Sequence, residues 1–345
     1  MCCHVISTYR LELKHTWTIA RGSADFKEYS FVELSAEGVV GRGEAAHNIR
    51  YGESLESIRE FLLEARGLFD SANPYEFYEL NKKNLALAQG QNAAKASLDM
   101  ALLDWVTQRL QVPLYALWGL NPAHTPKTSY SIGIDSPQAV YEKVREAEAY
   151  PILKIKLGGE QDEEIMRAVR EATDRPVRVD ANEGWQDREL ALERMQWLAG
   201  LNVEFVEQPM PAGRLAEVAW LRDHSPLPLV ADEDVKTVND IPALARAYHG
   251  INIKIMKSGG LQEALRMIHV ARALGLKIML GCMIESSLGI TAAAHLSPLV
   301  DWADLDGNLL IKNDPYRGVK VEGGRLLLPH TPGLGVERIQ SAKIE

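Results

Sequence analysis

Hydrophobic and polar residues alternate at the start of the chain as they do in β-strands. The alternation covers residues 5–13 and 29–34, and a third run at 39–45 follows a Glu37-Gly38 turn. Strand-length runs joined by a short turn are typical of an antiparallel meander. The pattern therefore predicts a small antiparallel sheet at the N-terminus.

Helical periodicity then replaces the alternation. It covers residues 54–65, a stretch from Pro74 into the 80s, and residues 92–110, which are rich in alanine and leucine. A block at 113–126, with its glycine and prolines, is typical of a linker. The first third of the chain is therefore predicted to be an α+β unit.

From residue 130 onward, short apolar runs alternate with amphipathic helical stretches. The eight runs are 130–134, 152–157, 177–179, 203–206, 227–230, 251–255, 277–280 and 302–305. Helical patterns between them include 163–172, 189–198 and 262–274. This many strand–helix repeats predict a closed parallel (β/α) barrel. A last pattern at 319–328 is typical of a hairpin, which could return to the first unit.

The composition is that of a soluble globular protein, with 46% hydrophobic and 25% charged residues in 345. A formal net charge of −9 argues against a general nucleic-acid surface and against binding to an anionic membrane. No apolar run approaches the ~18 residues of a membrane helix. Three cysteines without a C-x-x-C pair cannot form a disulfide framework, so we expect a reducing compartment, the cytoplasm.

A charged residue stands at or near the end of five successive barrel strands. These residues are Lys156, Asp180, Glu207, Asp232 and Lys254, at intervals of 24, 27, 25 and 22 residues, each close to one strand–helix repeat. One charge per repeat lies at the same height on neighbouring strands, at the C-terminal mouth where barrel active sites form. Solvated surface charge would not keep this register.

Asp180, Glu207 and Asp232 would then face one another from three adjacent strands. Bare carboxylates at this separation repel, and a hard divalent cation relieves the repulsion. An all-oxygen ligand set with room for water and substrate suits Mg²⁺. The alternative is three unrelated ion pairs at strand ends.

Lys154 and Lys156 alternate on one strand, so both point into the mouth of the barrel. Two ammonium groups this close are expected to lower each other's pKa toward a value useful for a base. Lys254 comes from a strand nearly opposite. Two bases on opposite sides of one carbon can invert a stereocentre, with the metal stabilising the enolate formed in between. The alternative for Lys154 and Lys156 is binding of phosphate or a surface role.

Five motifs in this order make the chain resemble the enolase superfamily, and within it the muconate lactonising enzyme subgroup. They are Lys154-Ile155-Lys156, Asp180-Ala181-Asn182, Val206-Glu207-Gln208-Pro209, Ala231-Asp232-Glu233 and Asn252-Ile253-Lys254. The resemblance implies a modified (β/α)₈ barrel, (β/α)₇β, with an N-terminal α+β capping domain completed by the C-terminal segment. The expected boundaries are 1–124 for the capping domain, 125–315 for the barrel and 316–345 for the returning segment.

The resemblance also implies roles for these residues. Mg²⁺ would bind Asp180, Glu207 and Asp232, and Lys156 and Lys254 would be the acid/base pair. Three further residues would support catalysis: Lys154, Asn182 and Glu233. The Glu233 carboxylate would pair with a lysine.

The end of the barrel carries information about the substrate. Asp304-Leu305-Asp306 puts two carboxylates on one face, which suits a cationic group such as a free α-ammonium and would repel dianions. The sequence Asp-x-Asp is similar to the signature of dipeptide epimerases. So are the segments around Tyr51 and around Met283 and Glu285. The alternative is that the two aspartates only cap a turn before Gly307.

The reaction implied is inversion of the α-carbon of the C-terminal residue of a dipeptide, whose free amino end would lie against Asp304 and Asp306. Arg21 matches a loop in which relatives with acidic substrates carry arginine, which favours L-Ala-D/L-Glu and a place in peptidoglycan turnover. The nearby Asp25, Lys27 and Glu28 leave basic or apolar second residues open.

Several alternatives stay open. They are an N-acylamino acid racemase, an o-succinylbenzoate synthase or a muconate cycloisomerase of the same subgroup, and, more remotely, a non-catalytic metal-binding barrel. Barrels of this type commonly associate, which leaves a homo-oligomer open.

Overall fold

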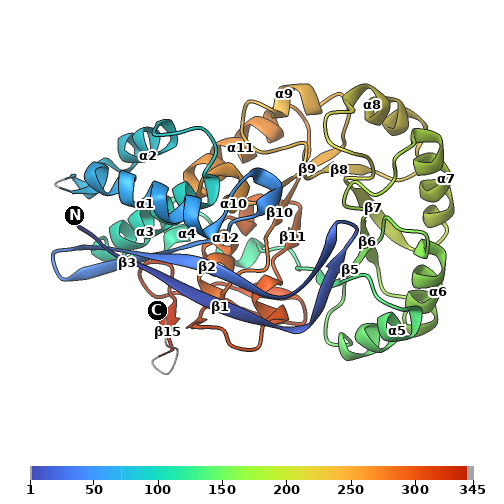
Figure 1. Cartoon of the computed structure of the whole chain (residues 1–345), viewed down its shortest axis with the longest axis horizontal. Helices are drawn as coiled ribbons and strands as arrows, with labels where there is room; N and C mark the ends of the chain where they lie inside the picture. The colour runs from blue at the N-terminus through green and yellow to red at the C-terminus, as the bar shows by residue number, and fades with distance from the viewer. Residues whose placement is uncertain (1, 71, 340–345) are drawn as a thin grey trace.

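The N-terminal sheet is dominated by one long hairpin, shown in blue in Figure 1. The computed structural model describes residues 2–70 and 72–339. Strands β1 (Cys2–Ile19) and β2 (Gly22–Ala36) pair antiparallel, and β3 (Val39–Ala45) pairs with β2. The first two strands are longer than the predicted 5–13 and 29–34, because Trp17, Thr18 and Ile19 continue the pairing with residues 22–24. Aromatic and β-branched side chains favour such an extension. Arg21, expected in a loop, therefore lies at the tip of the hairpin.

Helices pack against one face of this sheet. They are α1 (Leu55–Phe69) and α3 (Asn92–Arg109), while α2 (Phe77–Ala86) packs on these two helices. All three are close to the predicted segments, and the short α4 (Leu114–Leu117) lies in the predicted linker. Helix α3 is buried from residue 93 to residue 107. Gly41 and Gly43 of β3 touch the α3 backbone so closely that a Cβ atom would collide with it. The two glycines therefore allow the helix to lie directly on the sheet.

Eight parallel strands in sequence order form the barrel, and each coincides with a predicted run. The strands are β4 (Tyr130–Ile132), β5 (Leu153–Lys156), β6 (Val177–Asp180), β7 (Val203–Glu207), β8 (Leu229–Ala231), β9 (Gly250–Ile253), β10 (Lys277–Gly281) and β11 (Trp302–Asp304). A parallel bridge between Thr128 and Ala303 joins the first strand region to the last. Ser129 N–H donates to Ala303 O at 3.1 Å beside it, so the sheet closes.

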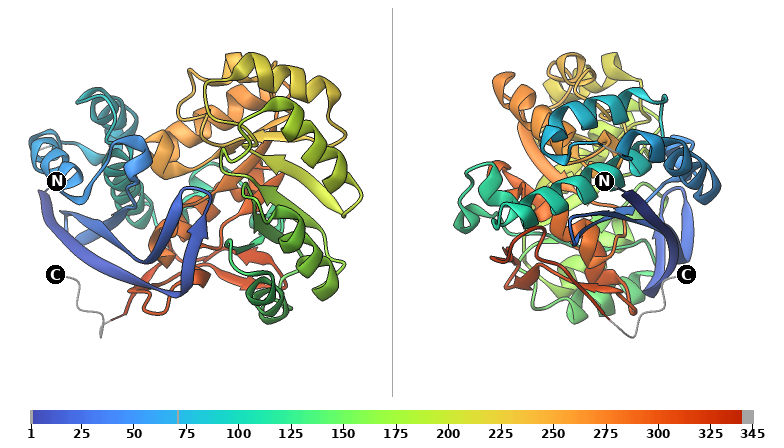
Figure 2. Two further views of the ribbon diagram at one scale, coloured as in Figure 1. Left: turned by 45° about the vertical axis from the view of Figure 1, so that its right-hand side comes forward. Right: turned by 90° about the vertical axis from the view of Figure 1, so that its left-hand side faces the viewer.

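Helices cover the outside of the barrel (Figures 1 and 2). They are α5 (Pro137–Glu146), α6 (Asp162–Ala172), α7 (Arg188–Ala199), α8 (Leu215–His224), α9 (Ile241–Leu244), α10 (Ile255–Ser258), α11 (Leu261–Ala273) and α12 (Ser287–Ala294). In the described part of the chain, a 3₁₀ turn at Gly307–Leu310 and short strands follow β11 in place of an α-helix. The predicted (β/α)₇β barrel is confirmed.

The C-terminal strands form two antiparallel pairs. The predicted hairpin at 319–328 is present as β13 (Lys320–Glu322) and β14 (Arg325–Leu327), while β12 (Tyr316–Arg317) pairs with β15 (Glu337–Arg338).

Contacts of the next residues tie this segment to the first domain. Leu334 N–H donates to Asp104 Oδ1 of α3 at 2.8 Å, and Gly333 bridges to Pro113. We propose on these contacts that the C-terminal segment completes the capping domain, with boundaries near 124 and 315. Residues 340–345 of that predicted segment lie outside the described residues. Among the residues described, no helix is long and apolar enough to span a membrane.

Candidate active site

The charged residues at the strand ends lie at one height, as the spacing predicted. Lys156 of β5 is the register partner of Asp180 on β6, and Asp180 is the partner of Glu207 on β7. Asp232 and Lys254 immediately follow β8 and β9. Parallel pairing therefore brings five chemically active side chains to the same rim of the barrel.

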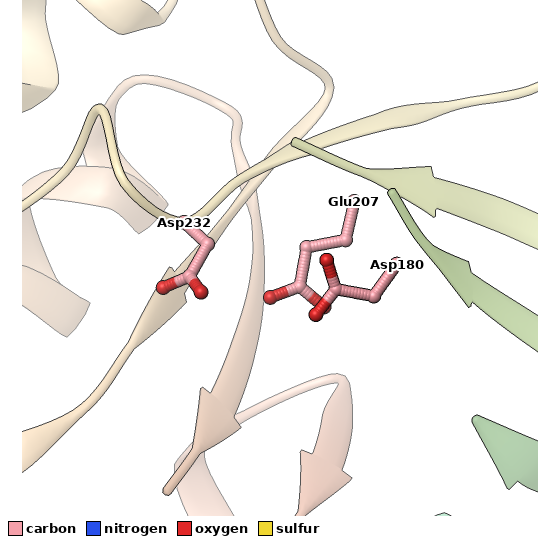
Figure 3. Close-up of side chains that lie close together, drawn as sticks. All are labelled: Asp180, Glu207 and Asp232. Carbon is pink, nitrogen blue, oxygen red and sulfur yellow. The ribbon is translucent and has the colours of Figure 1, made fainter. Parts of the chain in front are cut away.

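Three carboxylates meet at this rim (Figure 3). Asp180, Glu207 and Asp232 are at most 1% exposed, and one oxygen of each lies within 4.8 Å of the others. Asn252 Nδ2 donates to Glu207 Oε1 at 2.7 Å, which orients that carboxylate. Burial, and next the charge of Asp180, raises the pKa of Glu207 to about 8. The three carboxylates therefore bring an all-oxygen donor set to one buried point, which suits a hard cation such as Mg²⁺.

Lysines surround the carboxylates. Lys154 Nζ lies 2.6 Å from Glu207 Oε2 and 3.2 Å from Asp180 Oδ2, and Lys156 Nζ lies 2.5 Å from the same Asp180 oxygen. On the other side, Lys254 Nζ lies 2.8 Å from Asp232 Oδ2.

The expectation that Lys154 has a pKa lowered by its neighbouring lysine is wrong, and the pKa of Lys254 is raised as well. Burial does favour the neutral amine, but the neighbouring carboxylates outweigh it. The pKa of Lys154 is raised by Asp304, Glu207 and Asp180, and that of Lys254 by Asp232 and Glu207. The spacing along the sequence did not convey that carboxylate oxygens lie within 2.6–2.8 Å of both ammonium groups.

Lys257 is a further residue of this site, and the pattern of charges at strand ends does not include it. Its buried ammonium contacts Asp232 Oδ1 and donates to the carbonyl oxygen of Asp232 at 2.5 Å. Residues 254 and 257 are separated by three positions at the start of α10, so both reach the same carboxylate. That i, i+3 spacing was the available signal.

Lys156 and Lys254 lie on opposite sides of one cavity. Their strands, β5 and β9, are four places apart in the order of eight strands, which is half of a closed barrel. Both lysines line a cavity of about 630 Å³, and so do Asp232, Asp304 and Asp306. The three candidate metal ligands come from β6, β7 and the end of β8, between the two lysines.

Asp304 and Asp306 both line this cavity and are 4% and 3% exposed. Asp304 accepts from Lys154 Nζ at 2.7 Å and from Ser129 Oγ at 2.6 Å, so its charge is partly compensated within the protein. Asp306 Oδ2 accepts from Ser131 N–H at 2.6 Å. Burial, together with Asp304, raises the pKa of Asp306 to about 7. Of the two aspartates, Asp306 is therefore the one that a cationic group of a ligand would stabilise more.

Arg21 and Glu233 pair with each other. Arg21 Nη2 lies 2.7 Å from Glu233 Oε1, so the expected lysine partner of Glu233 is wrong. The hairpin tip extends far enough over the barrel for arginine to take that place. Arg21 Nη1 also donates to the carbonyl oxygen of Asn182 at 3.0 Å. The Asn182 side-chain oxygen is buried and accepts no hydrogen bond from the described residues.

The remaining predicted contacts divide into two groups. Tyr51 and Met283 line the cavity, whereas Glu285 is fully buried and is not among the lining residues. Glu285 Oε1 accepts from Met283 N–H at 2.7 Å, so it lies behind the wall that Met283 forms. Its position does not match direct contact with a substrate. Two of the other residues that could contact the substrate side chain, Lys27 and Glu28, line the cavity.

Comparisons with known proteins agree with this geometry. Residues 5–119 match the N-terminal domain of mandelate racemase / muconate lactonizing enzymes, and residues 138–342 match the enolase C-terminal domain-like family. The chain is 44% identical over 332 residues to the L-Ala-D/L-Glu epimerase of Bacteroides thetaiotaomicron. This match covers 96% of this chain and 86% of the relative. It is also 44% identical to the L-Ala-D/L-amino acid epimerase of Pedosphaera parvula over 333 residues, 93% of this chain and 94% of that one.

A solved structure has the same overall fold. The dipeptide epimerase of Cytophaga hutchinsonii, complexed with Mg and the dipeptide D-Ala-L-Val, superposes with a TM-score of 0.92 at 28% identity. The match covers 99% of this chain and 97% of that one. The two domain matches and the identity to these relatives show that this chain belongs to the mandelate racemase / muconate lactonizing enzyme family of the enolase superfamily.

Proposed function

We propose that this protein is a Mg²⁺-dependent dipeptide epimerase that inverts the α-carbon of the C-terminal residue. The observation that carries the proposal is the placement of Lys156 and Lys254 on opposite sides of one cavity, with three carboxylates between them. An α-carbon held there has one ammonium or amine on each face. One lysine removes the α-proton from its side, and the other delivers a proton from the opposite side.

The carboxylates and their neighbours prepare this transfer. Asp180, Glu207 and Asp232 would hold Mg²⁺, which when bound stabilises the charge that develops on the substrate carboxylate as the proton leaves. Lys154 is 1% exposed and touches Asp180, Glu207 and Asp304, so it fixes these carboxylates in place.

Asp304 and Asp306 support a substrate with a free amino end. A dipeptide has its α-ammonium a few bonds from the reacting carbon, and Asp306 offers a carboxylate that gains from a cation. An N-acylated amino group carries no positive charge that could pair with this carboxylate. The curated relatives, which are named as epimerases of L-Ala-D/L-Glu or L-Ala-D/L-amino acids, support the same class.

We infer L-Ala-D/L-Glu or a related dipeptide as the substrate. Cationic side chains beside the cavity, Arg21, Lys27 and Arg50, favour an acidic second residue, whereas the pairing of Arg21 with glutamates favours an uncharged one. Such dipeptides are fragments of peptidoglycan, and the cysteine usage favours a cytoplasmic place for their turnover.

The test is incubation in D₂O with Mg²⁺ and a mixed set of L,L and L,D dipeptides, followed by mass spectrometry. Epimerisation through solvent-exchanged lysines adds one deuterium to each dipeptide that turns over. The matched control is the same set with N-acetylated amino ends. Deuterium in the free dipeptides alone is the expected result. Deuterium in the N-acylated compounds alone would favour an N-acylamino acid racemase and overturn the proposal.

A further inference from the structure

The side chain of Glu183 joins three segments that are far apart in the sequence. Its Oε1 accepts from Arg50 Nη2 at 2.8 Å and from Ala212 N–H at 2.9 Å. Its Oε2 accepts from Arg50 Nε at 3.1 Å and from Arg21 Nη1 at 3.0 Å. The carboxylate therefore binds the tip of the β1–β2 hairpin, the loop that contains Arg50, and the loop after β7.

The barrel side of these contacts is firmly held. Glu183 and Asn182 have φ values of +67° and +45°, a left-handed conformation that non-glycine residues adopt only where the surroundings impose it. Glu183 N–H donates to Gln208 O at 2.9 Å, and Gly184 is packed too tightly against Gly158 to carry a Cβ atom. The loop after β6 therefore presents the Glu183 carboxylate at a fixed position on the rim.

The opposite side belongs to the exposed part of the cap. The side chains of Arg21 and Arg50 are 30% and 38% exposed, whereas that of Glu183 is 11% exposed. Both arginines line the cavity, so the segments that carry them form part of its wall. In Figures 1 and 2 the blue hairpin extends from the N-terminal sheet across to the barrel. The position of the wall over the mouth therefore depends on what the arginines bind.

Charge balance makes Glu183 the central member of this group. Without its carboxylate, Arg21 would keep its contact with Glu233, whereas Arg50 would lose the ion pair that it forms among the described residues, and the two guanidinium groups would repel. The pKa of Arg50 is raised chiefly by its hydrogen bonds to Glu183, which reflects this mutual stabilisation. Bidentate arginine–carboxylate pairs are also among the stronger and more directional contacts in proteins.

We propose that Glu183 is a positioning residue that closes the cap over the active-site cavity by holding Arg21 and Arg50 together. This inference rests on the proposed function for its kinetic consequence, but its structural consequence can be measured without turnover. Arg21 in this arrangement is a structural member of the closed wall, because both of its guanidinium ends are already bound by protein groups.

The test compares Glu183→Gln with the wild type and with Glu163→Gln. Glutamine keeps the shape and one acceptor oxygen but removes the charge. The control removes a glutamate that pairs with Arg194 on the outside of the barrel, between α6 and α7. Hydrogen–deuterium exchange is read by mass spectrometry for residues 16–26 and 47–54, and kcat and KM are measured on the dipeptides that turn over.

In Glu183→Gln we expect amide exchange of both segments to accelerate at least about tenfold, the size of effect typical of losing a charged hydrogen-bond partner. Amide exchange in the barrel helices should be unchanged. KM should also rise about tenfold, and kcat should change by a smaller factor. Glu163→Gln should match the wild type throughout. Unchanged exchange in the two segments of Glu183→Gln would overturn the proposal. If no protein, including the wild type, turns over a dipeptide, the proposed function fails while the exchange data still decide the role of Glu183.

Discussion

Replacing Glu285 with glutamine should stabilise the folded protein in mildly alkaline solution, because two buried carboxyl groups meet at this position. Glu285 and Glu44 are both fully buried, and both lie beside Gly289. Glu44 accepts hydrogen bonds from Ser286 N–H and Oγ and from Gly289 N–H. Glu285 Oε2 accepts none from the described residues. Burial raises the pKa of Glu44 to about 7, although the donors from Ser286 and Gly289 favour its charged form. Glu44 is therefore the first of the two to ionise, and Glu285 keeps its proton to higher pH.

The magnitude follows from the proton affinity of Glu285. Burial, followed by the charge of Glu44, raises its pKa from 4.5 to about 8. Above pH 4.5 the unfolded chain loses this proton while the folded protein keeps it until about pH 8. Stability therefore falls by about 1.4 kcal/mol for each pH unit in that window and then levels off. Glutamine has no proton to lose, so the variant should gain roughly 3 kcal/mol relative to the wild type between about pH 6 and about pH 8.5.

Urea unfolding followed by circular dichroism at about pH 6 and about pH 8.5 measures this difference. The control is Glu60→Gln, which removes an exposed glutamate on α1. We expect Glu285→Gln to have a higher unfolding midpoint than the wild type at the higher pH and a smaller advantage at the lower pH. An advantage that does not depend on pH, or none at all, would refute the assignment of the proton to Glu285.

Three further predictions concern the cavity. Because Asp306 must lose a proton to attract an ammonium, kcat/KM for dipeptides should rise as the pH increases through about 7, and Asp306→Asn should lower it at least about a hundredfold; a flat profile would contradict this role. Arg21→Met should lower kcat/KM for L-Ala-L-Glu and L-Ala-L-Gln by similar factors, whereas a loss confined to the acidic dipeptide would make Arg21 a reader of the substrate. Mg²⁺ should raise the thermal unfolding midpoint of the wild type by ligand linkage and leave Glu207→Gln unchanged, and equal shifts in both would argue against the three-carboxylate site.

The barrel and its rim could be predicted because both follow from local periodicity. Each strand-length run recurs after one helix, and a charge at the end of each run lands at a common height. Register pairing of Lys156 with Asp180, and of Asp180 with Glu207, confirms this reasoning. Closure of the sheet then places the β5 and β9 lysines opposite each other without further information from the chain.

Partners across the interface between cap and barrel could not be predicted. Glu44 and Ser286 are 242 positions apart, and no periodicity in either segment indicates that they meet. The same holds for Arg21, which reaches Glu233 because β1 and β2 extend beyond their apolar alternation. Glu183 was overlooked for a different reason. A glutamate in a loop has many candidate partners. The left-handed backbone that directs Glu183 toward two arginines occurs at non-glycine residues, so the amino-acid types do not indicate it.

In the proposed mechanism, two lysines act on opposite faces of one α-carbon. The most direct measurement is deuterium exchange from D₂O into the L,L and L,D forms of one dipeptide by the variants Lys156→Gln and Lys254→Gln. Each variant keeps one base, so each should exchange the α-proton of one form only, with no epimerisation, and the two variants should select opposite forms. Exchange of the same form by both variants, or of both forms by either, would contradict a two-base mechanism across the barrel.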